Sequence, residues 1–403
     1  MEGHLAALAG YLLTLFSMAT IGAIAPLVGK LAIAANASTA QVGFGIALYS
    51  VPSALLSGLI GLLADKWGAI RILVGSSLLA AAATFYLNQA TSLFELWLGL
   101  FGAGMGFCGV VVSAPALIIE RLGGNPRARW LSLWSTYGPA GFAIGLLLTA
   151  PFAEGQYWRA GLLIDGLLLM AGAAVAMCVP SSADRSTGRA KASGQTFGAI
   201  LALVHDARII RLALAISLPT GISYGTSLLM PSYLANVYGV TIATASGVVA
   251  LAKLIIVMAG GLISGWLLAR RVSAKPLFLA LALTGFIAQL ILYFPGSGFA
   301  PAVAALAVWL FTYAAMCGIA MALLPSLLGD EATSGAASGL VSQAISCTSF
   351  LGSVVYFSGA SWPVFVVIAA IGLTIAFAFL PGGAGKERTV KTGHIVSTTI
   401  KRA

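Results

Sequence analysis

Twelve long apolar runs divide this chain, and they constrain its fold more than any other feature. They lie near residues 6–29, 41–64, 71–89, 94–119, 130–152, 159–179, 209–235, 243–268, 276–294, 300–328, 334–357 and 362–380. About 20 consecutive apolar residues allow a helix to cross a bilayer. The runs are continuously apolar and do not alternate with a period of two, which favours helices over a β-barrel. We therefore expect an all-α integral membrane protein with twelve transmembrane helices.

The composition agrees with this expectation. The 403 residues are 60% hydrophobic and only 8% charged, whereas soluble proteins have about 45–50% apolar and about 25% charged residues. The first run follows Met1-Glu2-Gly3-His4, with no basic segment before it and no small-residue cleavage site after it. We expect it to be a retained helix and not a signal peptide.

The basic residues predict the orientation. If both termini are cytoplasmic, the predicted inner loops and the tail hold 18 of the 21 Lys and Arg residues, which agrees with the positive-inside rule. The net charge of +10 then reflects topology and requires no nucleic-acid partner. Lys30 and Arg159 are expected outside, and Lys253 within a helix. The 18 inner residues are Lys66, Arg71, Arg121, Arg127, Arg129, Arg185, Arg189, Lys191, Arg208, Arg211, Arg270, Arg271, Lys275, Lys386, Arg388, Lys391, Lys401 and Arg402.

No enzyme signature is present in the sequence. It contains no GxSxG, P-loop, HExxH or strand-bound GxGxxG motif. Its four cysteines fall in predicted spans and form no CxxC or Cys/His cluster, so we expect neither a metal nor another cofactor. The chain is predicted to be a transporter rather than an enzyme, with an ion gradient as its source of energy.

The two halves of the chain repeat one another. A polar stretch, "PSSADRSTGRAKASGQT" at 180–196, separates them. Gly43 and Gly247 lie 204 residues apart in matching places, and Pro26 and Pro231 lie 205 apart. We expect an N-terminal six-helix bundle (1–180), a cytoplasmic linker (181–207), a C-terminal six-helix bundle (208–381) and a basic cytoplasmic tail (382–403). Two parallel repeats around a midplane site are a recurring plan of secondary transporters.

The segment after the second run, "GLLADKWGAIR" at 61–71, carries a specific pattern. It fits G-x-L-A-D-[RK]-x-G-x-x-[RK] with Gly61, Leu63, Ala64, Asp65, Lys66, Gly68 and Arg71. With this loop, twelve spans and "WR" at 158–159, the sequence resembles the major facilitator superfamily. The resemblance implies two pseudo-symmetric six-helix bundles. It also implies that Gly61, Asp65, Lys66, Gly68 and Arg71 act as a latch that favours the outward-facing state.

Physical chemistry suggests roles for the same loop. Gly61 and its counterpart Gly265 are expected to allow close helix packing. Asp65 can cap the start of the third helix or face another helix N-terminus, and Lys66 and Arg71 can pair with acids. Exposed pairs contribute about 1 kcal/mol or less, which is enough to bias two conformations. The alternative is a plain turn with solvated charges.

Lys253 is the most informative charge, because a lysine inside a span costs about 2.5–3.5 kcal/mol on insertion scales. Helical periodicity places it with small and polar residues: Ser246, Val257, Gly260 and Ser264. The opposite stripe is Leu251, Ile255, Met258 and Leu262. We expect Lys253 to face the bundle interior and to bind an anion. Alternatively, it pairs with an acid or with helix-terminal carbonyls.

Two other ionisable residues lie at or within spans. Lys30 lies near the end of the first run and is either a lysine that reaches toward the headgroups, part of an outer gate, or a second anion contact. Asp165 shares a stripe with Gly161, Gly172 and Ala176, which predicts that it faces protein. It either forms structural hydrogen bonds or couples transport to protons.

Four polar residues in mid-span are further candidates for substrate binding: Tyr49, Tyr137, Tyr224 and Gln343. Tyr49 aligns with Lys253 through the 204-residue offset and is expected to face it. Ordinary hydrogen bonding between helices is the alternative for each.

A segment at 137–145, "YGPAGFAIG", partly resembles the glycine-proline motif of proton-driven exporters. Phe142-Ala143 stand where that motif has glycines, and Leu98 stands where those exporters often carry arginine. These departures weaken an efflux interpretation. Gly138 and Pro139 are expected to mark a kink.

Together these features predict a secondary active transporter that moves a small organic solute, most simply an anionic carboxylate, by alternating access as a proton symporter. We expect a monomer in the lipid bilayer of a bacterial inner membrane, with both termini cytoplasmic. The alternative is a proton-driven exporter of drugs or amphipathic metabolites.

Overall fold

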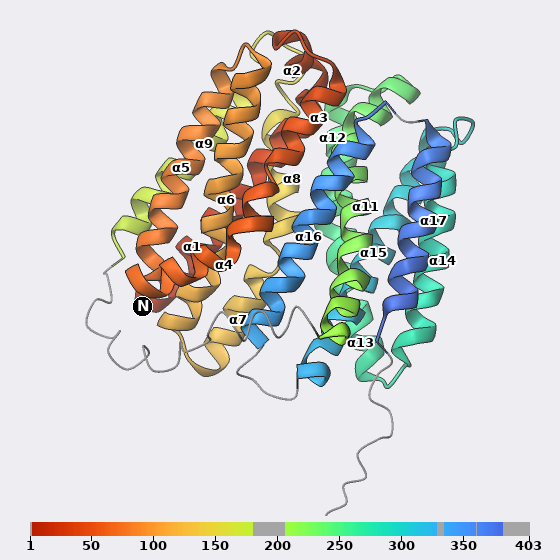
Figure 1. Ribbon diagram of the computed structural model, residues 1–403. Helices are drawn as coiled ribbons and strands as arrows, with labels where there is room; N and C mark the ends of the chain where they lie inside the picture. Colours follow the sequence, from red (N-terminus) through yellow and green to blue (C-terminus); the bar gives the residue numbers. More distant parts are fainter. Residues whose placement is uncertain (1, 180–205, 329–333, 360, 382–403) are drawn as a thin grey trace, which may run out of the picture.

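A computed structural model describes residues 2–179, 206–328, 334–359 and 361–381. Throughout these ranges the chain is helical and contains no strand. Most of the helices run between two opposite ends of the molecule (Figure 1). We call the end that holds the N-terminus the near end and the opposite end the far end. Nearly all of the predicted linker (181–207) and the whole predicted tail (382–403) lie outside the described residues.

The first half of the chain forms α1 to α9. The elements are α1 Glu2–Ile24, the 3₁₀ segment η1 Ala25–Leu27, α2 Val28–Ala34, α3 Thr39–Leu48, α4 Val51–Trp67, α5 Ala69–Gln89, α6 Leu93–Arg121, α7 Gly124–Trp134, α8 Tyr137–Thr149 and α9 Ala160–Met177.

The second half forms α11 to α17. Its elements are α11 Ala207–Tyr238, α12 Ile242–Leu251, the π-helical segment η3 Ala252–Val257, α13 Met258–Ala269, α14 Ala274–Tyr293, α15 Phe299–Leu328, α16 Ser334–Tyr356 and α17 Trp362–Phe379.

The number of spans agrees with the sequence prediction. Within the described residues, 11 helical stretches are long and apolar enough to cross a membrane. The bent pair α7 and α8, which meet at 45°, makes up to 12. This pair replaces the single fifth run predicted at 130–152. The break falls at Ser135 and Thr136, just before the predicted kink at Gly138 and Pro139, and Pro139 lies in the first turn of α8.

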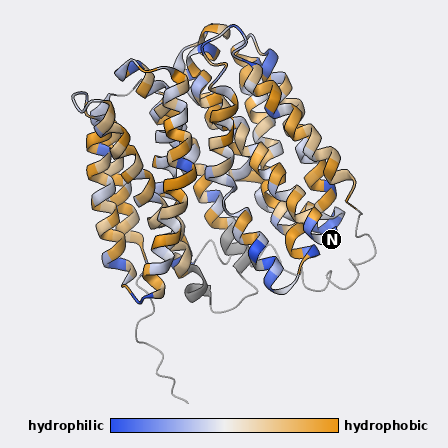
Figure 2. Cartoon of the chain, turned by 180° about the vertical axis from the view of Figure 1, so that it is seen from behind, coloured by the Kyte–Doolittle hydropathy of each residue, from blue (hydrophilic) through white to orange (hydrophobic). Residues whose placement is uncertain are grey.

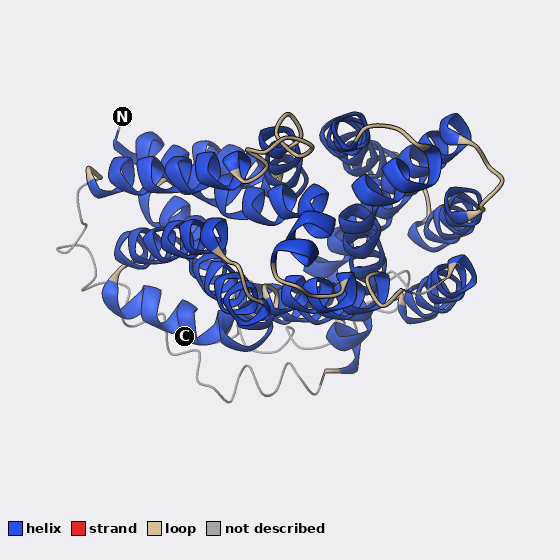
Figure 3. Cartoon of the chain, turned by 90° about the horizontal axis from the view of Figure 1, so that it is seen from above, coloured by secondary structure: helices blue, strands red, loops and turns tan. Residues whose placement is uncertain are grey.

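The two groups of helices meet through a limited set of elements. α16 of the second half packs against α3 and α4 of the first, α12 and η3 pack against α8, and α11 packs against η1. Seen from above, the groups lie side by side (Figure 3). At the near end, α7 of the first half and α13 of the second half lie apart in Figure 1. The segments η1, α2, α3 and α12, by contrast, gather at or toward the far end.

Burial follows the pattern expected in lipid. Large apolar side chains such as Leu55, Leu262 and Ile371 are exposed, and hydrophobic residues recur along the helices in Figure 2. Small residues and hydroxyls, including Thr14 and Ser223, are buried. Helices in membranes associate through close packing of small residues and through hydrogen bonds, because lipid supplies no hydrophobic drive between them.

Glycines bring α1 and α8 into close contact. A Cβ added at Gly22 would collide with the backbone of Phe142, and one at Gly145 would collide with the backbone of Ala19. The close approach predicted at Gly61 and Gly265 is wrong for this structure. A Cβ at Gly61 would find only Val112 Cγ1, at 3.9 Å, and one at Gly265 would meet nothing within 4 Å. The packing glycines lie on α1 and α8 instead.

The Gly22→Ala substitution is therefore expected to destabilise the protein by about 1–3 kcal/mol, because the added methyl meets rigid backbone. Gly29→Ala on α2 is the matched control, since a Cβ there meets nothing within 4 Å. Thermal unfolding in detergent would measure both variants. Equal melting temperatures would contradict the close α1–α8 contact.

Candidate functional site

Lys253 lies in the π-helical segment η3, at the boundary between the two halves. η3 packs against α15 of its own half and against α8 of the other half. The predicted stripe is confirmed: Lys253 is only 6% exposed and Ser246, Val257, Gly260 and Ser264 are also buried. Leu251, Ile255, Met258 and Leu262 are exposed on the opposite side. Helical periodicity was sufficient to place this side chain inside the protein.

The π-helical turn around Lys253 was not predicted. Such turns are rare, interrupt the regular hydrogen bonding of an α-helix and occur frequently at functional sites. The sequence of Ala252–Val257, AKLIIV, contains no glycine or proline and does not distinguish a π-helical turn from a regular α-helix. The turn lies where the helix faces α8 and marks Lys253 as a position with a specific geometric requirement.

The ammonium of Lys253 contacts an aromatic ring of the other half. Its Nζ lies 4.7 Å from the ring centroid of Phe142, which is within the range of a cation–π interaction. Phe142 is fully buried, and its backbone packs on Gly22 of α1. Within the part of the chain that the structure describes, no carboxylate forms an ion pair with Lys253. The acidic partner considered as an alternative is therefore not found there.

The hydrogen bond and the ring contact of Tyr49 lie within its own half. Its hydroxyl donates a 2.6 Å hydrogen bond to the Ser17 carbonyl of α1, and its ring packs 5.3 Å from that of Phe107. The residue is 2% exposed and lies at the end of α3. No described hydrogen bond or ring contact joins Tyr49 to Lys253, so the position of Tyr49 opposite Lys253 stays a prediction.

The other three predicted polar residues lie on three different helices, α8, α11 and α16. Tyr137 opens α8 and packs against Trp134 and Phe107, with ring centroids 5.0 and 6.3 Å away. Tyr224 of α11 lies near Ser50 and Tyr49 of the other half. Gln343 is half-buried in α16, the helix that packs against α3 and α4. Tyr137 and Tyr224 are also half-buried.

Asp165 lies in the centre of the first half. It is fully buried on α9, and its Oδ2 accepts a 2.6 Å hydrogen bond from the Thr20 hydroxyl of α1. Thr20 also lies 3.5 Å from the Thr84 hydroxyl of α5. The second carboxyl oxygen, Oδ1, is buried and has no hydrogen-bond partner among the described residues. The prediction that Asp165 faces protein is confirmed.

A similar polar cluster lies in the second half. Thr226 of α11 is contacted by Gln289 and Tyr293 of α14, at 3.5 and 3.3 Å, and donates to Tyr356 of α16 at 3.3 Å. Thr226 follows Thr20 by 206 residues, and Gln289 follows Thr84 by 205. The two halves thus hold matching polar centres, and among the described residues of these two centres the carboxyl group, that of Asp165, lies in the first. The sequence analysis did not identify this correspondence.

The loop between α4 and α5 forms a tight turn. Gly68 ends α4 and precedes α5 with a φ of +92°, a conformation that favours glycine. Asp65, Lys66 and Arg71 are exposed around it. The suggestion that Asp65 caps the next helix is not met, because Gly68 is the N-cap of α5 and no side chain caps it.

Lys30 takes part in a second group of contacts, at the far end. Its Nζ donates a 3.0 Å hydrogen bond to the Gly155 carbonyl in the connection between α8 and α9. The neighbouring Glu154 accepts a 2.8 Å hydrogen bond from the backbone N–H of Ile242, the first residue of α12. Glu154 was not among the predicted site residues, because an exposed acid in a loop carries no sequence signal.

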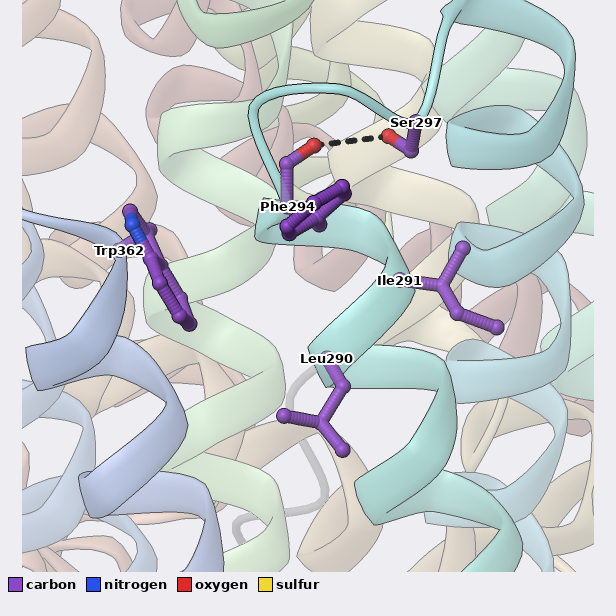
Figure 4. Close-up of a pocket in the computed structure, with 5 residues that line it drawn as sticks. All are labelled: Leu290, Ile291, Phe294, Ser297 and Trp362. Atoms are coloured by element: carbon purple, nitrogen blue, oxygen red, sulfur yellow. Dashed lines mark hydrogen bonds between the residues drawn. The ribbon is translucent and has the colours of Figure 1, made fainter.

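An apolar pocket on α14 and α17 lies on different helices from every predicted site residue. Leu290, Ile291, Phe294, Ser297 and Trp362 line it (Figure 4). Its only hydroxyl, that of Ser297, already donates to the Phe294 carbonyl at 3.0 Å. Apart from this hydroxyl and the indole N–H of Trp362, the lining is apolar, and it contains no charged group that could bind an anion.

Comparison with known proteins identifies the family. The model of the Major Facilitator Superfamily matches residues 8–354. The chain belongs to this superfamily. It is accordingly a multi-pass membrane transporter and not an enzyme, as the sequence predicted.

Two curated relatives match part of the chain. Both are named multidrug resistance protein MdtH. The protein from Aeromonas salmonicida (strain A449) is 34% identical over 130 residues, which are 32% of this chain and 33% of the relative. The protein from Aeromonas hydrophila subsp. hydrophila is 32% identical over 140 residues, 35% of each chain. The match thus spans about a third of each relative.

Solved structures share the fold over most of the chain. The xylose transporter XylE from E. coli, in an inward open conformation, superposes with a TM-score of 0.72 at 15% identity and covers 94% of this chain and 97% of its own. The nucleoside transporter NupG superposes with a TM-score of 0.71 at 14% identity, covering 94% of this chain and 100% of its own. At these identities the likeness concerns the fold alone.

Proposed function

We propose that this member of the superfamily moves a small organic anion of the carboxylate class by alternating access, and that Lys253 binds the anionic group. The observation that carries the proposal is an ammonium buried in a π-helical turn between the two halves, with an aromatic ring and no described carboxylate beside it. A substrate that contacts both Lys253 and α8 would interact with both halves at once.

The energetics favour an anion at Lys253. A lysine within a span costs about 2.5–3.5 kcal/mol on insertion scales, and a cation–π contact returns about 0.5–2 kcal/mol. The ring of Phe142 therefore offsets only part of the cost. A carboxylate would form a charge-assisted hydrogen bond with the ammonium, which is stronger than a contact between neutral groups. The lysine is thus better explained by a ligand than by its present neighbour.

Aromatic and amide side chains are suited to the organic part of such a solute. Tyr137 and Tyr224 are half-buried on α8 and α11, two helices that contact the other half, and Gln343 adds an amide on α16. Tyr49 contributes indirectly, because its ring supports Phe107 while its hydroxyl is engaged with Ser17. We include all four with Lys253 in the proposed substrate site.

The proposal also includes the orientation of the protein in the membrane and the latch of Gly61, Asp65, Lys66, Gly68 and Arg71. If the near end lies in the cytoplasm of a bacterial inner membrane, Asp65, Lys66 and Arg71 lie at the inner surface around the turn at Gly68, with Gly61 in the helix before it. Their charges would bias the equilibrium between inward- and outward-facing states. Protons are the proposed coupling ion, and Asp165 their proposed carrier. One chain contains every group that this scheme requires, so a monomer suffices.

A second candidate function is the export of amphipathic drugs, and one observation favours it. The curated relatives are named multidrug resistance proteins, and they match about a third of the chain. In that scheme the aromatic group of Trp134, Tyr137 and Phe107 would contact the drug. Lys253 would then serve packing alone.

Substrate-driven proton flux would distinguish the two candidates. Proteoliposomes loaded with a pH-sensitive dye would be offered monocarboxylates, dicarboxylates, amino acids and cationic drugs, with empty liposomes correcting for passive leak of acid. We expect a saturable signal from a carboxylate. A signal from cationic drugs alone would contradict the anion proposal and establish the exporter.

A further inference from the structure

The connection between α8 and α9, residues 150–159, is fixed at the far end by two basic residues. Lys30 of α2 donates to the carbonyl of Gly155 at 3.0 Å. Arg159, at the end of the connection, donates through Nη2 to the Ala90 carbonyl that ends α5. These are the two cations that the positive-inside pattern leaves on the far side. Both hold this connection in place.

The fixed connection presents Glu154 to the opposite half. Its Oε1 accepts the 2.8 Å hydrogen bond from Ile242 N–H at the start of α12. Thr241, the N-cap residue, accepts from Thr244 N–H at 3.1 Å. Two backbone N–H groups in the first turn of α12 therefore have side-chain partners. That of Thr244 bonds to Thr241 in its own half, and that of Ile242 bonds to Glu154 in the other half.

This contact has the chemistry of a reversible closure. The first N–H groups of a helix lack partners within the helix and carry partial positive charge, so a carboxylate there is favourable. Glu154 is exposed, and both groups can bond to water when they separate. The contact favours the joined state without leaving a buried unpaired group in the separated state.

We propose that Glu154 is a gating residue: it closes the far end by capping α12 across the two halves, and Lys30 positions it by holding Gly155. The closure is released when the halves separate at the far end. The proposal rests on the alternating access of the proposed function. Glu154 would thus control closure at the far end, whereas the segment 61–71 of the family pattern lies at the near end.

The test is hydrogen–deuterium exchange of the full chain in lipid nanodiscs, without substrate. In Glu154→Gln, backbone amides at the start of α12 and in 150–159 are expected to exchange about two- to five-fold faster, the factor that a helix-terminal charge of this kind contributes. Glu95→Gln is the matched control. Glu95 is partly exposed at the far end, but it accepts from Thr91 and Ser92 within its own half.

Lys30→Met tests the positioning role. Alone, it should accelerate exchange over the same peptides. Combined with Glu154→Gln, it should add little, because a positioning residue acts through the group it positions. A lysine that only reaches toward lipid headgroups would show no such coupling.

Two results would overturn the proposal. One is exchange in Glu154→Gln that equals the wild type at α12. The other is an acceleration that Glu95→Gln reproduces at the same peptides, which would show a general loss of charge at this surface. Because the measurement requires no substrate, it can fail while the carboxylate proposal stands, and the reverse also holds.

Discussion

Replacing Lys253 with methionine is expected to weaken the binding of the organic anion about 10- to 100-fold, the equivalent of losing a hydrogen bond to a charged group. The same change is expected to leave the protein as stable as the wild type, or more stable. Methionine keeps the length of the side chain and removes a buried ammonium that, among the described residues, has the Phe142 ring as its aromatic partner. Binding and stability should therefore change in different directions.

The two measurements are substrate binding by isothermal titration calorimetry and thermal unfolding in the same detergent. Lys275→Met is the matched control, because Lys275 is exposed in the first turn of α14 and its loss should alter neither quantity. Lys253→Arg keeps the charge over the Phe142 ring and should retain part of the affinity. A methionine variant that binds normally but unfolds earlier would show that the lysine has a structural role.

The sequence predicted the spans and the buried face of the Lys253 helix because both depend on the average polarity of many residues. Helical periodicity places Ser246, Lys253, Val257 and Gly260 on one side, and insertion into lipid forces the polar side inward. Such patterns survive local irregularities. The π-helical turn and the break between α7 and α8 did not follow from these patterns, because they depend on packing against distant helices.

Individual contacts were predicted less well, for a related reason. The internal repeat aligns Tyr49 with Lys253, yet the Tyr49 hydroxyl donates to Ser17, a residue 32 positions away. The partner on the Lys253 side is Phe142, which the sequence analysis noted only as a departure from an exporter motif. Sequence repetition gives the place of a helix in the fold, whereas the direction of a side chain depends on the groups that surround it.

The Asp165→Asn substitution is expected to reduce substrate-driven proton flux to the level of empty liposomes while exchange of substrate across the membrane continues. Asparagine keeps the shape of the side chain and can still accept the hydrogen bond from Thr20, but it cannot take up or release a proton. Proton flux and substrate counterflow in the same proteoliposomes would measure the two activities separately. The substitution therefore tests coupling and not binding.

The second half of the protein supplies the control for this experiment. Gln289 belongs to the matching polar cluster around Thr226 and is also fully buried. Gln289→Met disturbs a buried polar centre of the same kind, but it removes no group that can carry a proton, so coupling should persist even if stability falls. Normal proton flux in Asp165→Asn would exclude Asp165 as the carrier. Loss of both activities with early unfolding would assign it a structural role. Loss of coupling alone, in the half with the carboxyl and not in the half without it, would show that the two similar halves differ in function at this one position.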